Sequence, residues 1–142
     1  MILQDFHVHT TFCDGKNSAE EMVLAAIDLG MKKIGFSSHS YTSFDESYCI
    51  KKSQINLYKQ EIFRLKEKYK DMITVLCGIE QDIFSDMPAV GYDYVIGSVH
   101  YLKKDNHYLP VDESEETFKN IAVKYFGGDF IRFSQYYFDC VG

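Results

Sequence analysis

The sequence predicts an α/β fold in which short parallel strands alternate with helices. Short apolar runs typical of strands alternate along the chain with stretches whose apolar residues recur at helical spacing. The longest run, residues 73–79, is apolar throughout, as expected for a parallel strand covered on both faces. With 142 residues, 46% of them hydrophobic and only two prolines, the chain has enough apolar material for one globular domain.

The first predicted unit is a strand over residues 2–6 followed by a helix. Ser18 and Glu21 have the spacing of a capping box, in which each side chain satisfies the backbone amide of the other residue. Gly30 suits the left-handed position just past a helix end. The helix between them has an apolar face made of Met22, Val23, Ala26, Ile27 and Leu29.

The same order of elements repeats along the chain. Residues 33–36 form a second strand-like run, and helical spacing after Ser53 predicts a second helix through Ile55, Tyr58, Ile62, Leu65 and Tyr69. Residues 73–79 and 94–99 predict the third and fourth strands. We find no internal sequence repeat and no linker, so a single α/β domain is expected.

The C-terminal third is predicted to be mostly helical. Asp112 and Glu115 have capping-box spacing ahead of another helical pattern, which Gly127-Gly128 ends. Residues 129–141 are aromatic-rich, also at helical spacing, and predict a last helix.

A polar stretch, residues 101–108, follows the fourth strand, and we expect it to form a loop that acts as a lid. Its Lys103 and Lys104 could attract a phosphate, but lysines on a loop are more often simply solvated. His107 is likewise expected to be a loop residue rather than a ligand.

Composition narrows the classes of partner. A net charge of −6 without a basic stripe argues against a nucleic-acid-binding surface. Apolar stretches are far shorter than the roughly 20 residues that cross a bilayer, and we recognise no signal peptide, so no membrane partner and a cytoplasmic location are expected. Four cysteines without paired-motif spacing are expected to be reduced, and for Cys13, four residues after His9, we favour a structural role.

Residues able to bind metals follow the carboxyl end of every predicted strand: His7 and His9 after the first, His39 after the second, Glu80 after the third and His100 after the fourth. In parallel sheets the loops that leave these ends converge on one face. A lone histidine is more often structural, but this joint placement favours a metal site. Asp14 is a weaker candidate because Asp-Gly is also a common turn dipeptide.

The residue types also suit a hydrolase. Imidazole and carboxylate together bind borderline divalent ions such as zinc, manganese or iron, and a glutamate can bridge two of them. Such ions lower the pKa of bound water toward about 7 and offset charge on an attacked phosphoryl group. The pattern therefore predicts hydrolysis of a small phosphate ester.

These positions resemble the PHP (polymerase and histidinol phosphatase) superfamily. The resemblance rests on His7-Val-His-Thr10 followed by Asp14, on Gly35-Phe-Ser-Ser-His39, on Gly78-Ile-Glu80 and on Gly97-Ser-Val-His100. Together with Tyr125-Phe-Gly-Gly128, these motifs look most like the histidinol-phosphatase branch.

The resemblance implies a distorted (β/α)7 TIM-like barrel that holds up to three divalent ions. It implies His7, His9 and Glu80 at one ion, Glu80 bridging to a second bound by His100, and Asp14 and His39 at a third. Glu80 and His100 would also serve catalysis. The implied reaction, in histidine biosynthesis, converts L-histidinol phosphate and water to L-histidinol and phosphate.

The chain departs from the family in length, because such a barrel needs about 250 residues and the four predicted strands supply about four β/α units. We therefore expect residues 1–142 to be a PHP domain truncated before the C-terminal metal-binding motifs. Open sheet edges then predict a homo-oligomer or a missing C-terminal half. The alternative function is a catalytically incomplete fragment that acts as a metal-binding or assembly subunit; an exonuclease module is disfavoured by the acidic charge.

Overall fold

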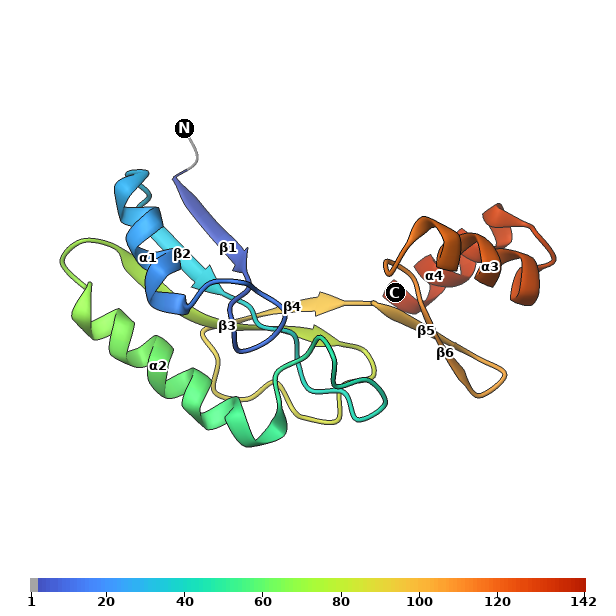
Figure 1. Cartoon of the computed structure of the whole chain (residues 1–142), viewed down its shortest axis with the longest axis horizontal. Coiled ribbons are helices and arrows are strands. Elements are labelled where there is room, and N and C mark those ends of the chain that lie inside the picture. The colour runs from blue at the N-terminus through green and yellow to red at the C-terminus, as the bar shows by residue number, and fades with distance from the viewer. Residues whose placement is uncertain (1–2) are drawn as a thin grey trace. The chain divides into compact units, whose positions relative to one another are not determined.

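The computed structural model describes residues 3–142, so Ile2 of the predicted first strand lies outside the described residues. The chain divides into two compact units. The first runs to Gln81 and includes Ser85–Gly97, and the second combines Asp82–Phe84 with Ser98–Gly142. Each unit is described by itself, since their relative positions are not determined (Figure 1).

The first unit is built on a parallel sheet that curls as part of a TIM-like barrel, which confirms the predicted fold class (Figure 1). Its strands lie in the order β1-β2-β3-β4, and the β1–β2 and β2–β3 pairs are parallel. Their bounds are Gln4–Val8 for β1, Lys33–Phe36 for β2, Thr74–Asp82 for β3 and Tyr94–Ser98 for β4.

Helices α1 (Ala19–Asp28) and α2 (Ile55–Lys68) connect the first three strands, with a short 3-10 turn, η1 (Lys52–Gln54), before α2. The predicted capping box starts α1, because Ser18 Oγ accepts from Glu21 N at 3.3 Å and Glu21 Oε2 accepts from Ser18 N at 2.8 Å. After the helix, Gly30 takes the predicted left-handed conformation with φ +71°.

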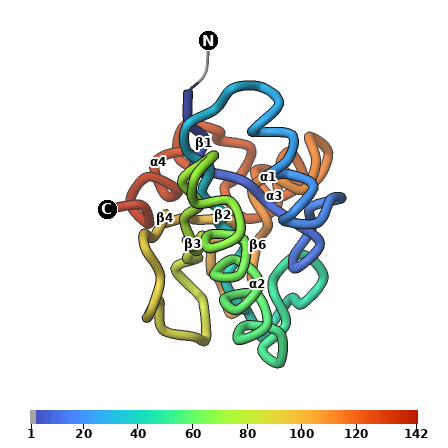
Figure 2. Tube along the Cα trace, turned by 90° about the vertical axis from the view of Figure 1, so that its left-hand side faces the viewer, coloured from blue at the N-terminus to red at the C-terminus, as the bar shows by residue number. Residues whose placement is uncertain are grey.

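Both helices pack their apolar faces on one face of the sheet (Figure 2). This core is formed by residues from every layer, among them Val23 and Ala26 of α1, Tyr58, Ile62 and Leu65 of α2, and Ile34, Phe36 and Val75 of the strands. Because side chains alternate along a strand, the opposite face of β2 and β3 carries Gly35, Gly78 and Glu80.

The second unit contains a feature that the sequence analysis predicted wrongly. Residues 101–108 are not a loop but an antiparallel hairpin of β5 (Tyr101–Lys104) and β6 (His107–Pro110). Asp105 and Asn106 form its turn with φ of 49° and 61°. Aspartate and asparagine tolerate positive φ, and a two-residue turn of this kind matches the twist of paired strands.

Two helices complete this unit, α3 (Glu115–Phe126) and α4 (Phe130–Val141). The cap predicted for α3 was misplaced: Ser114, not Asp112, accepts from Thr117 N at 3.0 Å. A hydroxyl directly before the first turn reaches that amide, whereas Asp112 lies too early in the chain. The predicted helix end at Gly127, with φ +64°, and the helix over the last segment are confirmed.

Aromatic side chains form the core of the second unit. The rings of Phe118, Phe126 and Phe133 lie with neighbouring centroids 4.6 and 4.8 Å apart. Leu102 and Leu109, which face each other across the hairpin, are buried against the same cluster. Among residues 3–142, no helix has the length and apolarity needed to cross a membrane.

The hairpin turn generates a prediction about local stability. Asn106→Val should weaken the hairpin by about 1–2 kcal/mol because a β-branched residue is strained at positive φ, whereas Asn106→Gly should leave it as stable or more so. Amide hydrogen exchange at Leu102 and Leu109 measures the difference. Equal protection in the two variants would contradict the turn geometry.

Candidate metal centre

His7 and His9 lie at the carboxyl end of β1. They are two residues apart, so a strand presents both on the same face, and their rings stack with centroids 5.2 Å apart. Val8 between them points the other way and is buried in the core. Alternation along the strand therefore places Val8 in the apolar core and both imidazoles on the opposite face.

Backbone pairing beyond the end of β2 brings His39 beside Glu80. The two residues form an isolated parallel bridge, in which Glu80 N donates to Ser38 O at 3.1 Å and Ser40 N donates to Glu80 O at 2.8 Å. His39 and Glu80 are both buried. The main chain thus fixes which histidine faces this carboxylate.

Asp14 reaches the same place through a tight turn. Cys13 N and Gly15 N both donate to Thr10 O, at 2.9 and 3.1 Å. A Cβ at Gly15 would lie 2.4 Å from Thr10 N, so only glycine fits there. The turn that weakened Asp14 as a ligand candidate is therefore what carries it to the histidines.

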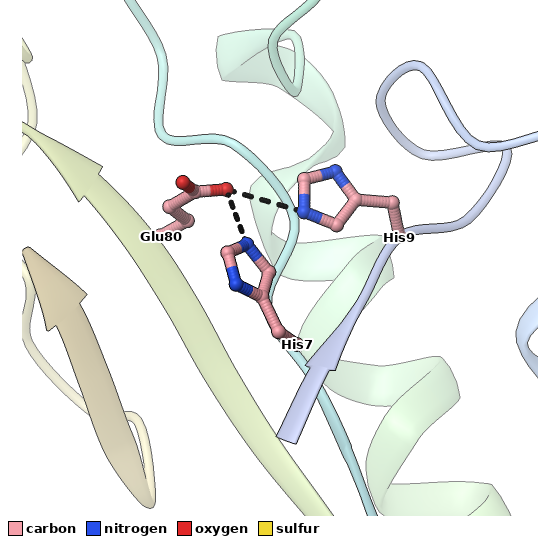
Figure 3. A group of neighbouring side chains, drawn as sticks. All are labelled: His7, His9 and Glu80. Carbon is pink, nitrogen blue, oxygen red and sulfur yellow. Dashed lines mark hydrogen bonds and ion pairs between the residues drawn. The ribbon is translucent and has the colours of Figure 1, made fainter. Parts of the chain in front are cut away.

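One oxygen of the Glu80 carboxylate lies close to three imidazole rings. Glu80 Oε2 lies 3.0 Å from His7 Nε2, 3.1 Å from His9 Nε2 and 3.1 Å from His39 Nδ1. Figure 3 shows the first two contacts, with the His7 and His9 rings both directed at Glu80. Three rings from two segments of the chain, the end of β1 and the stretch after β2, thus converge on a single oxygen.

Asp14 faces the other side of two of these rings. Its Oδ1 lies 3.0 Å from His9 Nδ1, and its Oδ2 lies 3.5 Å from His39 Nε2. His9 and His39 therefore each lie between two carboxylates, with one ring nitrogen toward Asp14 and the other toward Glu80. Four side chains form a closed cycle.

This cycle has too few protons to be satisfied by neutral histidines. A neutral imidazole has one N–H, and an ionised carboxylate only accepts. Of the four contacts that His9 and His39 make with Glu80 and Asp14, neutral rings can supply protons for two. The other two would set lone pair against lone pair, so the cluster is suited to cations.

The pKa values show the same preference. Contact with the Cys13 sulfur, followed by the Glu80 and Asp14 carboxylates, raises the pKa of His9 to about 10 against the opposing effect of burial. Burial alone would raise the pKa of Asp14, but His9 and His39 together lower it below its usual value. The surroundings of His9 thus stabilise positive charge, carried by a proton or by a metal ion.

Within the first unit, two sets of donor atoms have the size of a metal site. His7, His9 and Glu80 form one, and His9, Asp14 and His39 form the other; within each set the ligand atoms lie within 4.8 Å of one another. Imidazole nitrogen with carboxylate oxygen is a donor combination for zinc, manganese or iron. The residues fit a divalent transition metal.

His100 belongs to the second unit and is held there by Asp82. Asp82 Oδ2 accepts from His100 N at 3.0 Å and lies 3.2 Å from the ring Nδ1, while its Oδ1 accepts from Phe84 N at 2.7 Å. Since a carboxylate only accepts, this contact places the ring proton on Nδ1 and makes Nε2 the acceptor atom of the ring. Whether His100 joins Glu80 at a shared ion stays a prediction.

Sequence reasoning missed Asp82 and undervalued Cys13. Asp82 follows Glu80 by two residues on β3, and the Glu-x-Asp alternation at a strand end was the signal available for it. Cys13 Sγ lies 3.8 Å from His9 Nδ1, so this thiol borders the cluster instead of filling a core. Burial alone would raise the pKa of the thiol, but contact with His9 lowers it.

The three side chains considered in the expected lid have contacts within the second unit. Lys104 Nζ lies 5.3 Å from the ring centroids of Phe126 and Tyr136, Lys103 Nζ lies 5.0 Å from that of Tyr108, and His107 Nδ1 lies 2.8 Å from Asp105 O. These contacts agree with a structural role for the three side chains.

Comparison with known proteins identifies relatives of this chain. The profile of the PHP domain matches residues 5–142. The histidinol-phosphatase of Bacillus subtilis is 31% identical over 137 residues, which cover 83% of this chain and 51% of that protein. The chain therefore spans about half the length of the curated relatives it matches.

Solved structures show the same fold. A protein from Listeria monocytogenes, described as a candidate histidinol phosphatase, matches with a TM-score of 0.69 at 23% identity over 82% of this chain and 52% of that one. The histidinol phosphate phosphatase of Lactococcus lactis, solved with zinc, L-histidinol and phosphate, matches with a TM-score of 0.58 at 20% identity over 86% of this chain and 54% of that one.

The turn at Gly15 generates a prediction for the second donor set. Gly15→Ala should displace the turn and Asp14 with it, because the added methyl would overlap the Thr10 backbone, and should weaken zinc binding by about tenfold or more. Gly97→Ala is the matched control, since a Cβ there meets nothing within 4 Å. Isothermal titration with zinc measures both. Equal affinities would contradict a role for Asp14.

Proposed function

The chain belongs to the PHP domain family, and from that premise we propose that it is a metal-dependent phosphomonoesterase of the histidinol-phosphatase kind. The observation that carries the proposal is the cycle of two buried or half-buried imidazoles between two carboxylates, which lacks the protons to satisfy itself. The proposed reaction is hydrolysis of L-histidinol phosphate to L-histidinol and phosphate, within histidine biosynthesis and in the cytoplasm.

In this proposal His7, His9 and Glu80 hold one divalent ion, and Asp14 and His39 hold another. His100 would offer its Nε2 to a further ion, which we expect it to share with Glu80. The bound ions would supply a hydroxide from water at neutral pH and would offset charge on the phosphoryl group. Zinc, manganese and iron all suit the donor atoms.

The protein's own contribution is to prepare the ligands. The main chain on both sides of His39 fixes its distance from Glu80, and Asp82 sets the tautomer of His100. Burial of Glu80, which is 4% exposed, keeps water from competing for the oxygen that the imidazoles face. These groups orient the site and hold its protons before any substrate binds.

The relatives support the chemistry and the substrate class. The Bacillus subtilis relative bears the name histidinol-phosphatase. The Lactococcus lactis structure contains zinc together with L-histidinol and phosphate, the two products of the proposed reaction. Glu80 and His100 are the residues we propose to act in catalysis.

A second candidate is a metal-binding or assembly subunit that lacks turnover by itself. Two observations favour it. The chain spans about half the length of its relatives, and β1 and β4 are edge strands of the sheet, whose backbone groups can pair with another chain. Metal bound without hydrolysis of any phosphate ester would favour this candidate over the enzyme.

His9→Ala should abolish activity. The purified wild-type chain is expected to hold about one to three equivalents of transition metal and to release phosphate from histidinol phosphate. His9→Ala removes a ligand, so metal content should fall and phosphate release should be lost. His107→Ala should change neither, because its ring contacts Asp105 O within its own hairpin. Elemental analysis and a phosphate assay decide; a metal-replete but inert wild-type chain would overturn the enzyme proposal.

We also propose that copies of the chain associate. The outer strands β1 and β4 offer backbone groups for pairing, and Val95 on β4 is 49% exposed. Light scattering at micromolar concentration should give at least twice the mass of one chain. A monodisperse monomer would contradict the proposal.

A further inference from the structure

Tyr94 spans the sheet of the first unit from one outer strand to the other. It belongs to β4, yet its hydroxyl donates to the carbonyl oxygen of Phe6 on β1 at 2.7 Å. In the strand order, β2 and β3 lie between these two strands. The side chain must therefore cross both central strands to make this bond.

Two glycines make room for the crossing. A Cβ built at Gly35 of β2 would lie 2.5 Å from the Tyr94 hydroxyl oxygen, and one at Gly78 of β3 would lie 2.3 Å from ring atom Cζ. Neither glycine has a positive φ, so its backbone conformation does not demand glycine. What demands it is the ring, which lies directly on the main chain of both strands.

The ring lies on the same face of the sheet as the metal ligands and one step before them. Gly78 and Glu80 are two residues apart on β3, so their side-chain positions share a face. On β1, the carbonyl that Tyr94 holds belongs to the residue just before His7. The tyrosine thus contacts β3 at Gly78, two residues before Glu80, and β1 at Phe6, one residue before His7.

We propose that Tyr94 is a positioning residue that sets the distance between the ends of β1 and β3, and hence between His7 and Glu80. The arrangement of ring, two glycines and Phe6 carbonyl is here named the Tyr94 strap. In an open sheet, curvature is otherwise free to vary, and a side chain of fixed length that joins the outer strands limits it. This inference rests on the proposed function, because it assigns the strap a role in metal binding.

Two further observations agree with the strap. Burial raises the pKa of the Tyr94 phenol, so the hydroxyl stays protonated and can donate at any pH at which the protein is studied. The Phe6 ring packs against the Tyr94 ring with centroids 5.9 Å apart, which adds an apolar contact to the hydrogen bond at the same pair of strands.

The test compares two tyrosines that each donate to a backbone carbonyl at 2.7 Å. Tyr94→Phe keeps the ring and removes only the bond to Phe6; Tyr136→Phe removes the equivalent bond to Lys103 O in the second unit. Cobalt(II) is titrated into each metal-free chain, and its affinity and visible absorption are recorded. Far-UV circular dichroism establishes that both variants fold.

Tyr94→Phe should bind cobalt about three- to tenfold more weakly than wild type, with an altered ligand-field spectrum, which corresponds to the loss of one hydrogen bond. Tyr136→Phe should stay within about twofold of wild type. Equal affinities and spectra for the two variants would overturn the strap and leave the proposed function intact. A wild-type chain that binds no cobalt would overturn the proposed function, and with it the role of the strap.

A second pair of variants tests the ring against the glycine. Gly78→Ala should weaken cobalt binding in the wild-type background, because the methyl would displace the ring, and should weaken it less in a Tyr94→Leu background. Should Tyr94→Phe fail to fold, this double-mutant cycle still decides. An equal loss in both backgrounds would show that Gly78 acts independently of Tyr94 and would contradict the strap.

Discussion

The structure of the first unit depends on bringing two carboxylates and three imidazoles into contact. Neutral imidazoles have too few N–H groups to donate a hydrogen bond in each of these contacts. Glu80 is buried, and an unpaired buried charge is costly. One of its oxygens is instead faced by three imidazole rings from two segments, the end of β1 and the stretch after β2. The strand order, the backbone bridge at His39 and the turn at Asp14 all serve to keep these groups together.

Much of this was predictable because local rules and strand topology agree. The candidate ligands follow strand ends, and parallel strands end on one side of the sheet, so their proximity could be predicted without knowing the side-chain rotamers. The same holds for the capping box of α1 and the glycine after it, which depend on neighbours within four residues. Asp14 was harder to predict, because an Asp-Gly pair fits both a turn residue and a ligand. In the structure the turn itself places the Asp14 side chain beside His9.

Features that depend on long-range contacts or on competing local signals escaped prediction. The hairpin over residues 101–108 is polar on its exposed side, which masked the buried pair Leu102 and Leu109. Asp112 and Ser114 both precede α3, and spacing alone did not decide between them. The bonds from Asp82 to His100 and from Tyr94 to Phe6 join residues 18 and 88 positions apart, and no periodicity reports such pairs.

Three glycines beside the site leave no space for a single methyl group, although none of them is a ligand. Gly15 lies against the Thr10 backbone, and Gly35 and Gly78 lie under the Tyr94 ring. In a scan of all substitutions, these positions should tolerate as little change as the histidines themselves. Intolerance to substitution around this cluster therefore reflects lack of space as well as chemical role. A map of intolerant positions would include the candidate ligands and also the glycines packed beside them.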